Sequence, residues 1–198
     1  MRFILSLILS FSALGADVAL SVQGYESPSP NVELISHGRG VAVSKRHVLT
    51  ARHVITNSTE TNFRTPRVLV NGAWIVGKVA GHDQKNDLAI IELPEDCLKP
   101  VDVLTIPELE VQGSPGLSPQ KHRKTTIQAF KTYVDEIKDL ANPGDAGGLS
   151  GSPMLADDRL IGIVSSAGRD EGGVFIVVIG PEPIKQLLAN HIKPESKD

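Results

Sequence analysis

One stretch of the chain decides the fold: Val68-Leu69-Val70-Asn71-Gly72-Ala73-Trp74-Ile75-Val76-Gly77-Lys78-Val79. It holds two apolar runs on either side of an Asn-Gly pair. Asn71 and Gly72 both tolerate the positive φ that a type I′ turn requires. The stretch therefore predicts two antiparallel strands joined by a tight hairpin.

Short apolar runs of the same kind recur on both sides of this hairpin, each bounded by turn residues. A final segment, Pro181-Glu182-Pro183, is followed by apolar residues spaced for one face of a helix. Many short strands with one late helix predict an all-β fold of two packed antiparallel β-barrels with a C-terminal α-helix. The predicted strands lie at 32–35, 40–43, 47–49, 68–70, 74–79, 88–93, 101–106, 127–134, 153–155, 160–165 and 174–179.

A stretch rich in proline, glycine and serine divides the two strand-rich halves. We therefore expect a first β-barrel at 32–108, a linker at 109–125, and a second β-barrel with the terminal helix at 126–198. Residues 16–31 are expected to be an N-terminal arm or a short pro-region.

The first 15 residues have the features of a signal peptide. Met1-Arg2 is basic, residues 3–13 are apolar apart from serines, and Ala13-Leu14-Gly15 supplies small residues for cleavage. A membrane anchor is the alternative, but it needs about 20 apolar residues, and polar residues begin at Asp17. We therefore predict a secreted or periplasmic protein without a stable membrane anchor.

Composition limits the other classes of function. The 23 acidic and 20 basic residues give a net charge of −3 without long runs of one sign, so nucleic acid is not an expected partner. Cys97 is the only cysteine, so no intramolecular disulfide can form. Because His-Glu-x-x-His and paired-cysteine motifs are missing from the sequence, we expect no metal and no cofactor.

Three segments carry residues suited to chemistry, and they occur in the order His, Asp, Ser. They are Val48-Leu49-Thr50-Ala51-Arg52-His53, Asn86-Asp87-Leu88-Ala89-Ile90-Ile91-Glu92-Leu93, and Gly148-Leu149-Ser150-Gly151-Ser152-Pro153. With these segments the chain resembles the trypsin/chymotrypsin-like serine proteases, in particular the disulfide-free bacterial HtrA-like protease domain, here without the PDZ domain of HtrA proteins. The Gly162-Ile163-Val164-Ser165 strand, twelve residues after Ser150, extends this resemblance.

The resemblance implies a catalytic triad of His53, Asp87 and Ser150. A serine hydroxyl is a weak nucleophile at neutral pH, so it needs a base such as histidine. A buried carboxylate then fixes the tautomer of the imidazole and stabilises its charged form. The backbone N–H groups of Gly148 and Ser150 are expected to form the oxyanion hole.

Two neighbouring residues are rivals for these roles. Ala146 lies in Gly144-Asp145-Ala146-Gly147-Gly148, which is similar to the family's Gly-Asp-Ser-Gly-Gly signature, but Ser150 has the better spacing to Gly162 and to Pro153. Asp83 is the rival of Asp87, but no apolar strand follows it directly.

The resemblance also implies a primary substrate pocket. Its base would be Gly144, with Asp145 next to it, and its walls would come from Ser165, Ser166, Ala167 and Gly173. Leu149 stands where trypsin-like zymogens have the aspartate that pairs with a cleaved N-terminus, so activation through that ion pair is not expected.

The sequence therefore predicts a serine endopeptidase that cleaves protein or peptide substrates through an acyl-enzyme. The alternatives are a catalytically inactive trypsin-like domain that acts as a binding module, and an esterase, because acyl transfer to water is shared chemistry.

Overall fold

The computed structural model describes residues 18–57, 59, 62–103, 129–133, 148–156, 159–171 and 173–192. The predicted signal peptide, the linker at 109–125, and the positions Gly144, Asp145 and Ala146 lie outside the described residues. None of the helices in the described ranges is both long and apolar enough to cross a membrane.

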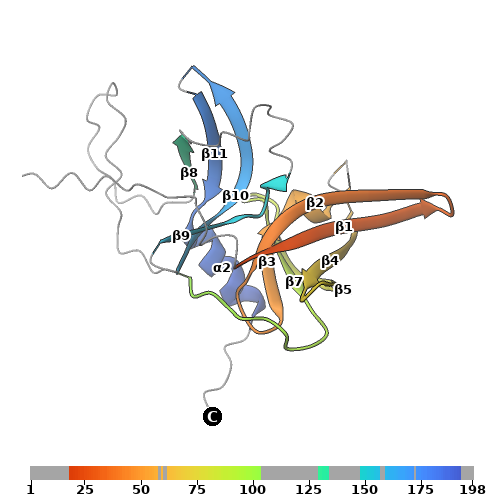
Figure 1. The fold of residues 1–198 in the computed structure, drawn as a ribbon. Coiled ribbons are helices and arrows are strands. Elements are labelled where there is room, and N and C mark those ends of the chain that lie inside the picture. The colour runs from red at the N-terminus through yellow and green to blue at the C-terminus, as the bar shows by residue number, and fades with distance from the viewer. Residues whose placement is uncertain are drawn as a thin grey trace, which may run out of the picture.

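The first half of the chain forms an antiparallel sheet in the order β5-β4-β1-β2-β3-β7-β6 (Figure 1). A short 3-10 helix, η1 (Arg52–Ile55), follows β3. The strands are β1 (Ala19–Ser29), β2 (Val32–Ala42), β3 (His47–Ala51), β4 (Thr65–Val70), β5 (Ala73–Val76), β6 (Lys78–Asp83) and β7 (Leu88–Glu92).

This sheet curls back on itself through Gly77. The two strands at the ends of the order, β5 and β6, are consecutive in the chain and are separated only by that residue. The Gly77 N–H donates to the Pro66 carbonyl at 2.9 Å. A Cβ at position 77 would lie 2.5 Å from Ile91 Cγ2, so the bend needs glycine there. One bent segment therefore pairs with β4 at its start and with β7 at its end, as in a barrel.

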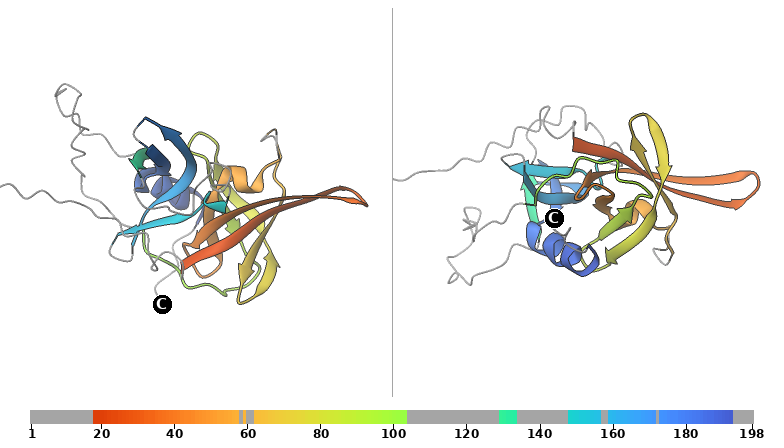
Figure 2. Two further views of the ribbon diagram at one scale, coloured as in Figure 1. Left: turned by 45° about the horizontal axis from the view of Figure 1, so that its top comes forward. Right: turned by 90° about the horizontal axis from the view of Figure 1, so that it is seen from below.

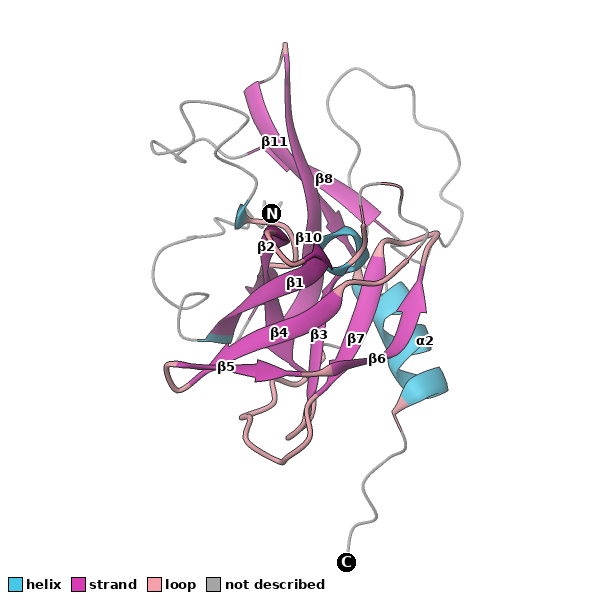
Figure 3. Ribbon diagram, turned by 90° about the vertical axis from the view of Figure 1, so that its right-hand side faces the viewer, coloured by secondary structure: helices cyan, strands magenta, loops and turns pink. Residues whose placement is uncertain are grey.

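The second half forms an antiparallel sheet in the order β8-β11-β10-β9. Its strands are β8 (Ala129–Tyr133), β9 (Pro153–Ala156), β10 (Arg159–Asp170) and β11 (Gly173–Ile179), and the helix α2 (Pro181–His191) follows. Figure 3 shows α2 beside β6 and β7 of the first sheet. The predicted all-β class with a C-terminal helix is confirmed, and the second barrel is represented among the described residues by these four strands.

A shared apolar core joins the two sheets and the helix. Each sheet also has a core of its own, one around Val48 and Ile91 and one around Val164 and Val178. Burial of a large aliphatic side chain contributes about 1.5–3 kcal/mol relative to exposure, so the shared core fixes how the two sheets lie against each other. Its buried members are Val41, Leu49, Leu88, Ile90, Leu160, Ile163, Ile179, Ile184 and Leu187.

The structure confirms the hairpin and corrects the start of the chain. Asn71 and Gly72 have φ values of 51° and 82°, and Val70 pairs with Ala73. The expectation of an arm or pro-region at 16–31 is wrong for 19–29, because this segment is strand β1 between β2 and β4. The run at 101–106 is described only to Val103, which makes an isolated bridge to Leu160 and no strand.

Candidate active site

His53 lies in η1, immediately after the buried strand β3. The first residue of η1, Arg52, donates its backbone N–H to the Asp87 carbonyl at 2.9 Å. The helical turn is thereby tied to the start of β7. This connection holds the histidine against the aspartate, although 34 residues separate them in the chain.

Asp87 ends the turn between β6 and β7 with a φ of 53°. Asp and Asn adopt this left-handed conformation more readily than other residues with side chains. Its carboxylate accepts two hydrogen bonds from His53, from the backbone N–H to Oδ1 at 3.0 Å and from the ring Nδ1 to Oδ2 at 2.8 Å. The rival Asp83 accepts instead from the backbone and side-chain amides of Asn86, at 3.1 and 2.5 Å.

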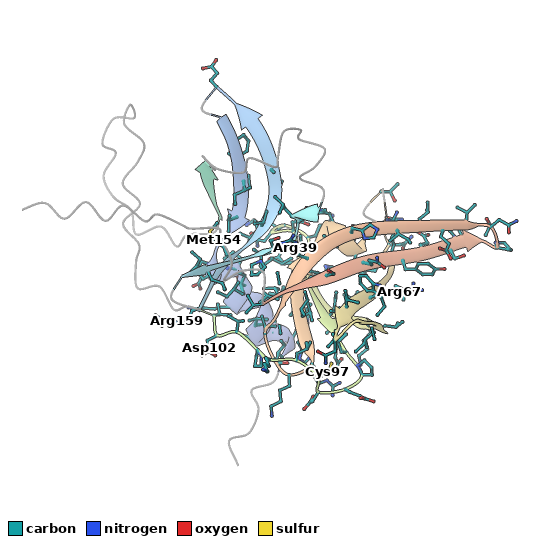
Figure 4. The ribbon with its side chains drawn as sticks, in the orientation of Figure 1. Arg39, Arg67, Cys97, Asp102, Met154 and Arg159 are labelled. Carbon is teal, nitrogen blue, oxygen red and sulfur yellow. The ribbon has the colours of Figure 1, made fainter. Side chains whose placement is uncertain are left out.

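Ser150 lies in the turn that leads into β9. Its carbonyl accepts the Arg39 N–H at 2.7 Å, and the next N–H, that of Gly151, donates to the Val164 carbonyl at 2.7 Å. Arg39 belongs to β2 and Val164 to β10, so both sheets hold this turn. Figure 4 shows Arg39 at the place where the β1–β2 hairpin meets the second sheet.

Ser165 connects the serine to the aspartate, a role that the sequence analysis missed. Its hydroxyl donates to Asp87 Oδ2 at 2.6 Å, and its carbonyl accepts from Ser150 Oγ at 3.4 Å. The family resemblance predicts Ser165 only in the wall of a substrate pocket. The structure therefore brings His53, Asp87, Ser150 and Ser165 together in one hydrogen-bonded group.

The environment of Asp87 favours its ionised form. Burial raises the pKa of its carboxyl. The hydrogen bonds from the His53 ring and from Ser165, the charge of His53 and its backbone N–H together outweigh burial, and the pKa falls below its usual 3.8. The side chains of His53 and Asp87 remain 37% and 26% exposed. A reactant in solution can therefore reach the imidazole.

The other predicted site residues are placed only in part. Gly148 is exposed at the start of the Ser150 turn, and a Cβ there would contact nothing within 4 Å. Ser166 is exposed and Ala167 half-buried in β10, and Gly173 begins β11 opposite Asp170. The base of the predicted pocket, at Gly144 and Asp145, lies outside the described residues. In the described part of the chain, no group of three or more His, Cys, Asp or Glu side chains could hold a metal ion.

Comparison with known proteins gives a curated relative of much greater length. The chain is 29% identical over 174 residues to a probable periplasmic serine endoprotease, DegP-like, from Hahella chejuensis. The aligned part is 79% of this chain and 35% of the relative. The chain thus spans about a third of the length of this relative.

Solved structures share the fold. The Rv3671c protease from M. tuberculosis in its active form superimposes with a TM-score of 0.58 at 18% identity, over 88% of this chain and 81% of that one. The inactive form of the Rv3671c protease gives a TM-score of 0.55 at 18% identity, over 89% of both chains. At this identity the likeness concerns the fold alone, and it agrees with the predicted chymotrypsin-like architecture.

A family match covers the site. Residues 38–163 match the trypsin-like peptidase domain family. This range includes His53, Asp87 and Ser150, and it ends within β10. As the three motifs predict, the chain belongs to the family of trypsin-like peptidase domains.

Proposed function

We propose that the protein is a serine endopeptidase in which His53, Asp87 and Ser150 form the catalytic triad. The observation that carries the proposal is the hydrogen-bonded group around Asp87. The His53 ring and the Ser165 hydroxyl both donate to its Oδ2, at 2.8 and 2.6 Å, and the Ser165 carbonyl accepts from Ser150. The family match and the DegP-like relative, named as a serine endoprotease, support the same activity.

Asp87 acts by fixing the tautomer of His53. An ionised carboxylate only accepts hydrogen bonds, so the ring nitrogen that faces it, Nδ1, carries the proton. The other ring nitrogen, Nε2, is then left with a lone pair. His53 can therefore take the hydroxyl proton of Ser150 as Ser150 Oγ attacks the substrate carbonyl, and the imidazolium formed lies against the negative carboxylate.

The oxyanion hole is assigned to the backbone N–H groups of Gly148 and Ser150. The tetrahedral intermediate carries negative charge on the former carbonyl oxygen, and a donor aimed at it is worth about 3 kcal/mol. His53 returns its proton to the leaving amine, and an acyl group stays on Ser150. A water molecule, deprotonated by His53, then hydrolyses this acyl-enzyme and frees the serine.

The proposed substrates are extended segments of proteins or peptides in a secreted or periplasmic setting, for which the relative named as periplasmic gives support. The primary side chain of the substrate would enter a pocket formed by Gly144, Asp145, Ser165, Ser166, Ala167 and Gly173. The chemistry is carried by side chains and backbone groups alone, so the proposal includes no cofactor.

A fluorophosphonate probe tests this function because it reacts with activated serines. We expect the purified protein to be labelled, Ser150→Ala to abolish labelling, and Ala146→Ser on the Ser150→Ala background to leave it absent. Ser152→Ala is the matched control, because Ser152 lies two residues from Ser150 in the same turn and should not affect labelling. If the folded wild-type protein takes up no probe, the endopeptidase is refuted and an inactive binding module becomes the better account.

A further inference from the structure

The β1–β2 hairpin extends well beyond the first sheet (Figures 1 and 2). β1 pairs with β4 only over Val22–Tyr25, and β2 pairs with β3 only over Gly40–Ala42. The outer half of the hairpin is therefore a two-stranded ribbon. Among the described strands, neither of its outer edges has a neighbour.

The contacts of Arg39 show which backbone groups of β2 face outward. Its N–H donates to the Ser150 carbonyl at 2.7 Å, and its carbonyl accepts from Thr50 Oγ1 at 2.6 Å. Both groups thus point away from β1. Along an antiparallel strand, the N–H and carbonyl groups of successive residues point to opposite sides. Glu33, Ile35 and His37, at every second position before Arg39, therefore also direct these groups outward. This row of residues is the open edge of β2.

The two edges of the ribbon differ in how well they are protected. Natural sheets blunt an exposed edge with proline or lysine. The β1 edge has Pro28 beyond the end of its pairing with β4, and Pro30 follows at the tip. The open edge of β2 has neither residue. The β2 half of the ribbon instead exposes three apolar side chains, Val32 at 43%, Leu34 at 41% and Ile35 at 43%.

We infer that the open edge of β2 pairs with the same edge of a second copy of this chain. The two strands would run antiparallel around a two-fold axis at Ile35. Glu33 then lies opposite His37 of the second copy, and the arrangement is the same on the other side of the axis. A carboxylate faces an imidazole donor in both pairs. The edge is thus complementary to itself in hydrogen bonding, through its backbone groups and through these side chains.

The pairing with its two-fold axis at Ile35 is the register in which all residues of the open edge are paired. A shift of the pairing by one step in either direction would place Glu33 opposite Arg39, or His37 opposite Asn31, of the second copy. The backbone groups of Arg39 are already bonded to Ser150 and Thr50, so they cannot pair. In the Ile35 register, all three residues of the open edge face one another on both chains.

Side-chain contacts within the chain hold Glu33 and His37 in place on the open edge of β2. The Tyr25 hydroxyl donates to Glu33 Oε1 at 3.0 Å, and Gln23 Nε2 lies 3.2 Å from His37 Nδ1. Tyr25 is also the register partner of Ile35. Glu33 and His37 are therefore both held on the ribbon before a second copy arrives, which lowers the entropy that is lost on pairing.

Sedimentation velocity with charge variants tests the dimer. All proteins carry Ser150→Ala so that self-cleavage cannot occur. We expect a monomer–dimer equilibrium for this parent, and dimerisation about tenfold weaker or more in Glu33→Lys and in His37→Glu. The first change sets an ammonium group against an imidazole in both pairs, and the second sets two carboxylates against each other in both pairs.

An equimolar mixture of the two variants should recover dimers. The introduced lysine of one variant would then face the introduced glutamate of the other, and the native Glu33 and His37 would meet on the other side of the axis. Glu33 and His37 lie on one strand four residues apart, so recovery on mixing can come only from contacts between chains. A variant that had merely lost its fold would not be rescued in this way.

Trp74→Ser, which removes an equally exposed apolar side chain from β5, is the control and should leave the equilibrium unchanged. The inference would be overturned if the Ser150→Ala parent stayed monomeric at its highest soluble concentration. It would also be overturned if Glu33→Lys and His37→Glu dimerised as strongly as the parent. Neither result would bear on the proposed peptidase, whose test is probe labelling of Ser150.

Discussion

Gly151 tests how the Ser150 turn is held, and Gly72 supplies a matched control. Both residues have nearly the same positive φ, 83° and 82° respectively. A Cβ at position 72 would meet nothing within 4 Å, whereas one at position 151 would lie 1.9 Å from the Arg39 carbonyl oxygen and 2.6 Å from Thr50 Oγ1. Both alanine variants therefore have the cost of a positive φ, and only Gly151→Ala adds a steric collision.

The magnitudes follow from these contacts. Left-handed backbone costs a residue with a Cβ about 1–2 kcal/mol, so Gly72→Ala should lower the free energy of unfolding by that amount. At position 151 the Cβ and the Arg39 oxygen must separate by more than about 1 Å to reach an ordinary carbon–oxygen contact. This movement breaks the bonds from Arg39 to Ser150 and from Thr50 to Arg39, each worth about 1–3 kcal/mol when buried groups lose their partners. We expect Gly151→Ala to cost roughly 3 kcal/mol more than the control.

Urea unfolding on the Ser150→Ala background measures the two costs without self-cleavage. On the wild-type background, Gly151→Ala should also lose fluorophosphonate labelling because Ser150 is displaced, while Gly72→Ala should keep it. If the two variants lose stability within about 1 kcal/mol of each other, the close approach of Gly151 to Arg39 does not hold the turn, and this reasoning is refuted.

Three further predictions concern Asp87, Ser165 and Ser152. The pKa of Asp87 is lowered in the fold, so its carboxylate stabilises the protein above the unfolded pKa of about 4 and this contribution is lost as the pH falls through the folded pKa. In urea unfolding, Asp87→Asn should remove this loss of stability at low pH. By reversing the tautomer of His53, it should also slow labelling by about 10⁴-fold, whereas Asp83→Asn should leave labelling unchanged. Ser165→Ala removes one donor to Asp87, so the pKa of Asp87 should rise and labelling should slow about tenfold, and an unchanged rate would contradict this role. The buried Ser152 hydroxyl bonds to no described residue, so Ser152→Ala should raise the free energy of unfolding by up to about 1 kcal/mol, and a clear loss in thermal melts would count against this view.

Much of the fold could be predicted because the signals for its hairpins and helix are formed by residues that are close together in the sequence. The hairpin at Asn71-Gly72 needs only two residues that tolerate positive φ, and α2 needs only the spacing of its apolar face after Pro181. Strand β1 was missed, although Val22 and Gly24 point inward and Ser21 is exposed. The segment was expected to be an N-terminal arm or a short pro-region, because its pairing with β4, which lies far along the chain, leaves no local trace.

The residues of the candidate site could be named from the sequence to a similar degree. His53, Asp87 and Ser150 stand in motifs that a family resemblance can supply. The contact of Ser165 with Asp87 joins residues 78 positions apart, on different sheets. The family resemblance implied a place for Ser165 in a pocket wall, but it gave no information about the hydrogen-bond partner of the Ser165 hydroxyl. Contacts of this kind are set by the docking of the sheets.

Docking of the two sheets is thus what assembles the site. His53 and Asp87 are fixed by β3 and β7 of the first sheet, whereas Ser165 belongs to β10 of the second. The turn that carries Ser150 bonds to both, through Arg39 and Val164. The shared core aligns these parts. Leu49 lies four residues before His53, and Leu88 directly follows Asp87. Both leucines pack in one cluster with Ile163, two residues before Ser165. A change in that core would alter the site without touching any of its side chains, because it would shift one sheet, and its half of the hydrogen-bonded group, against the other.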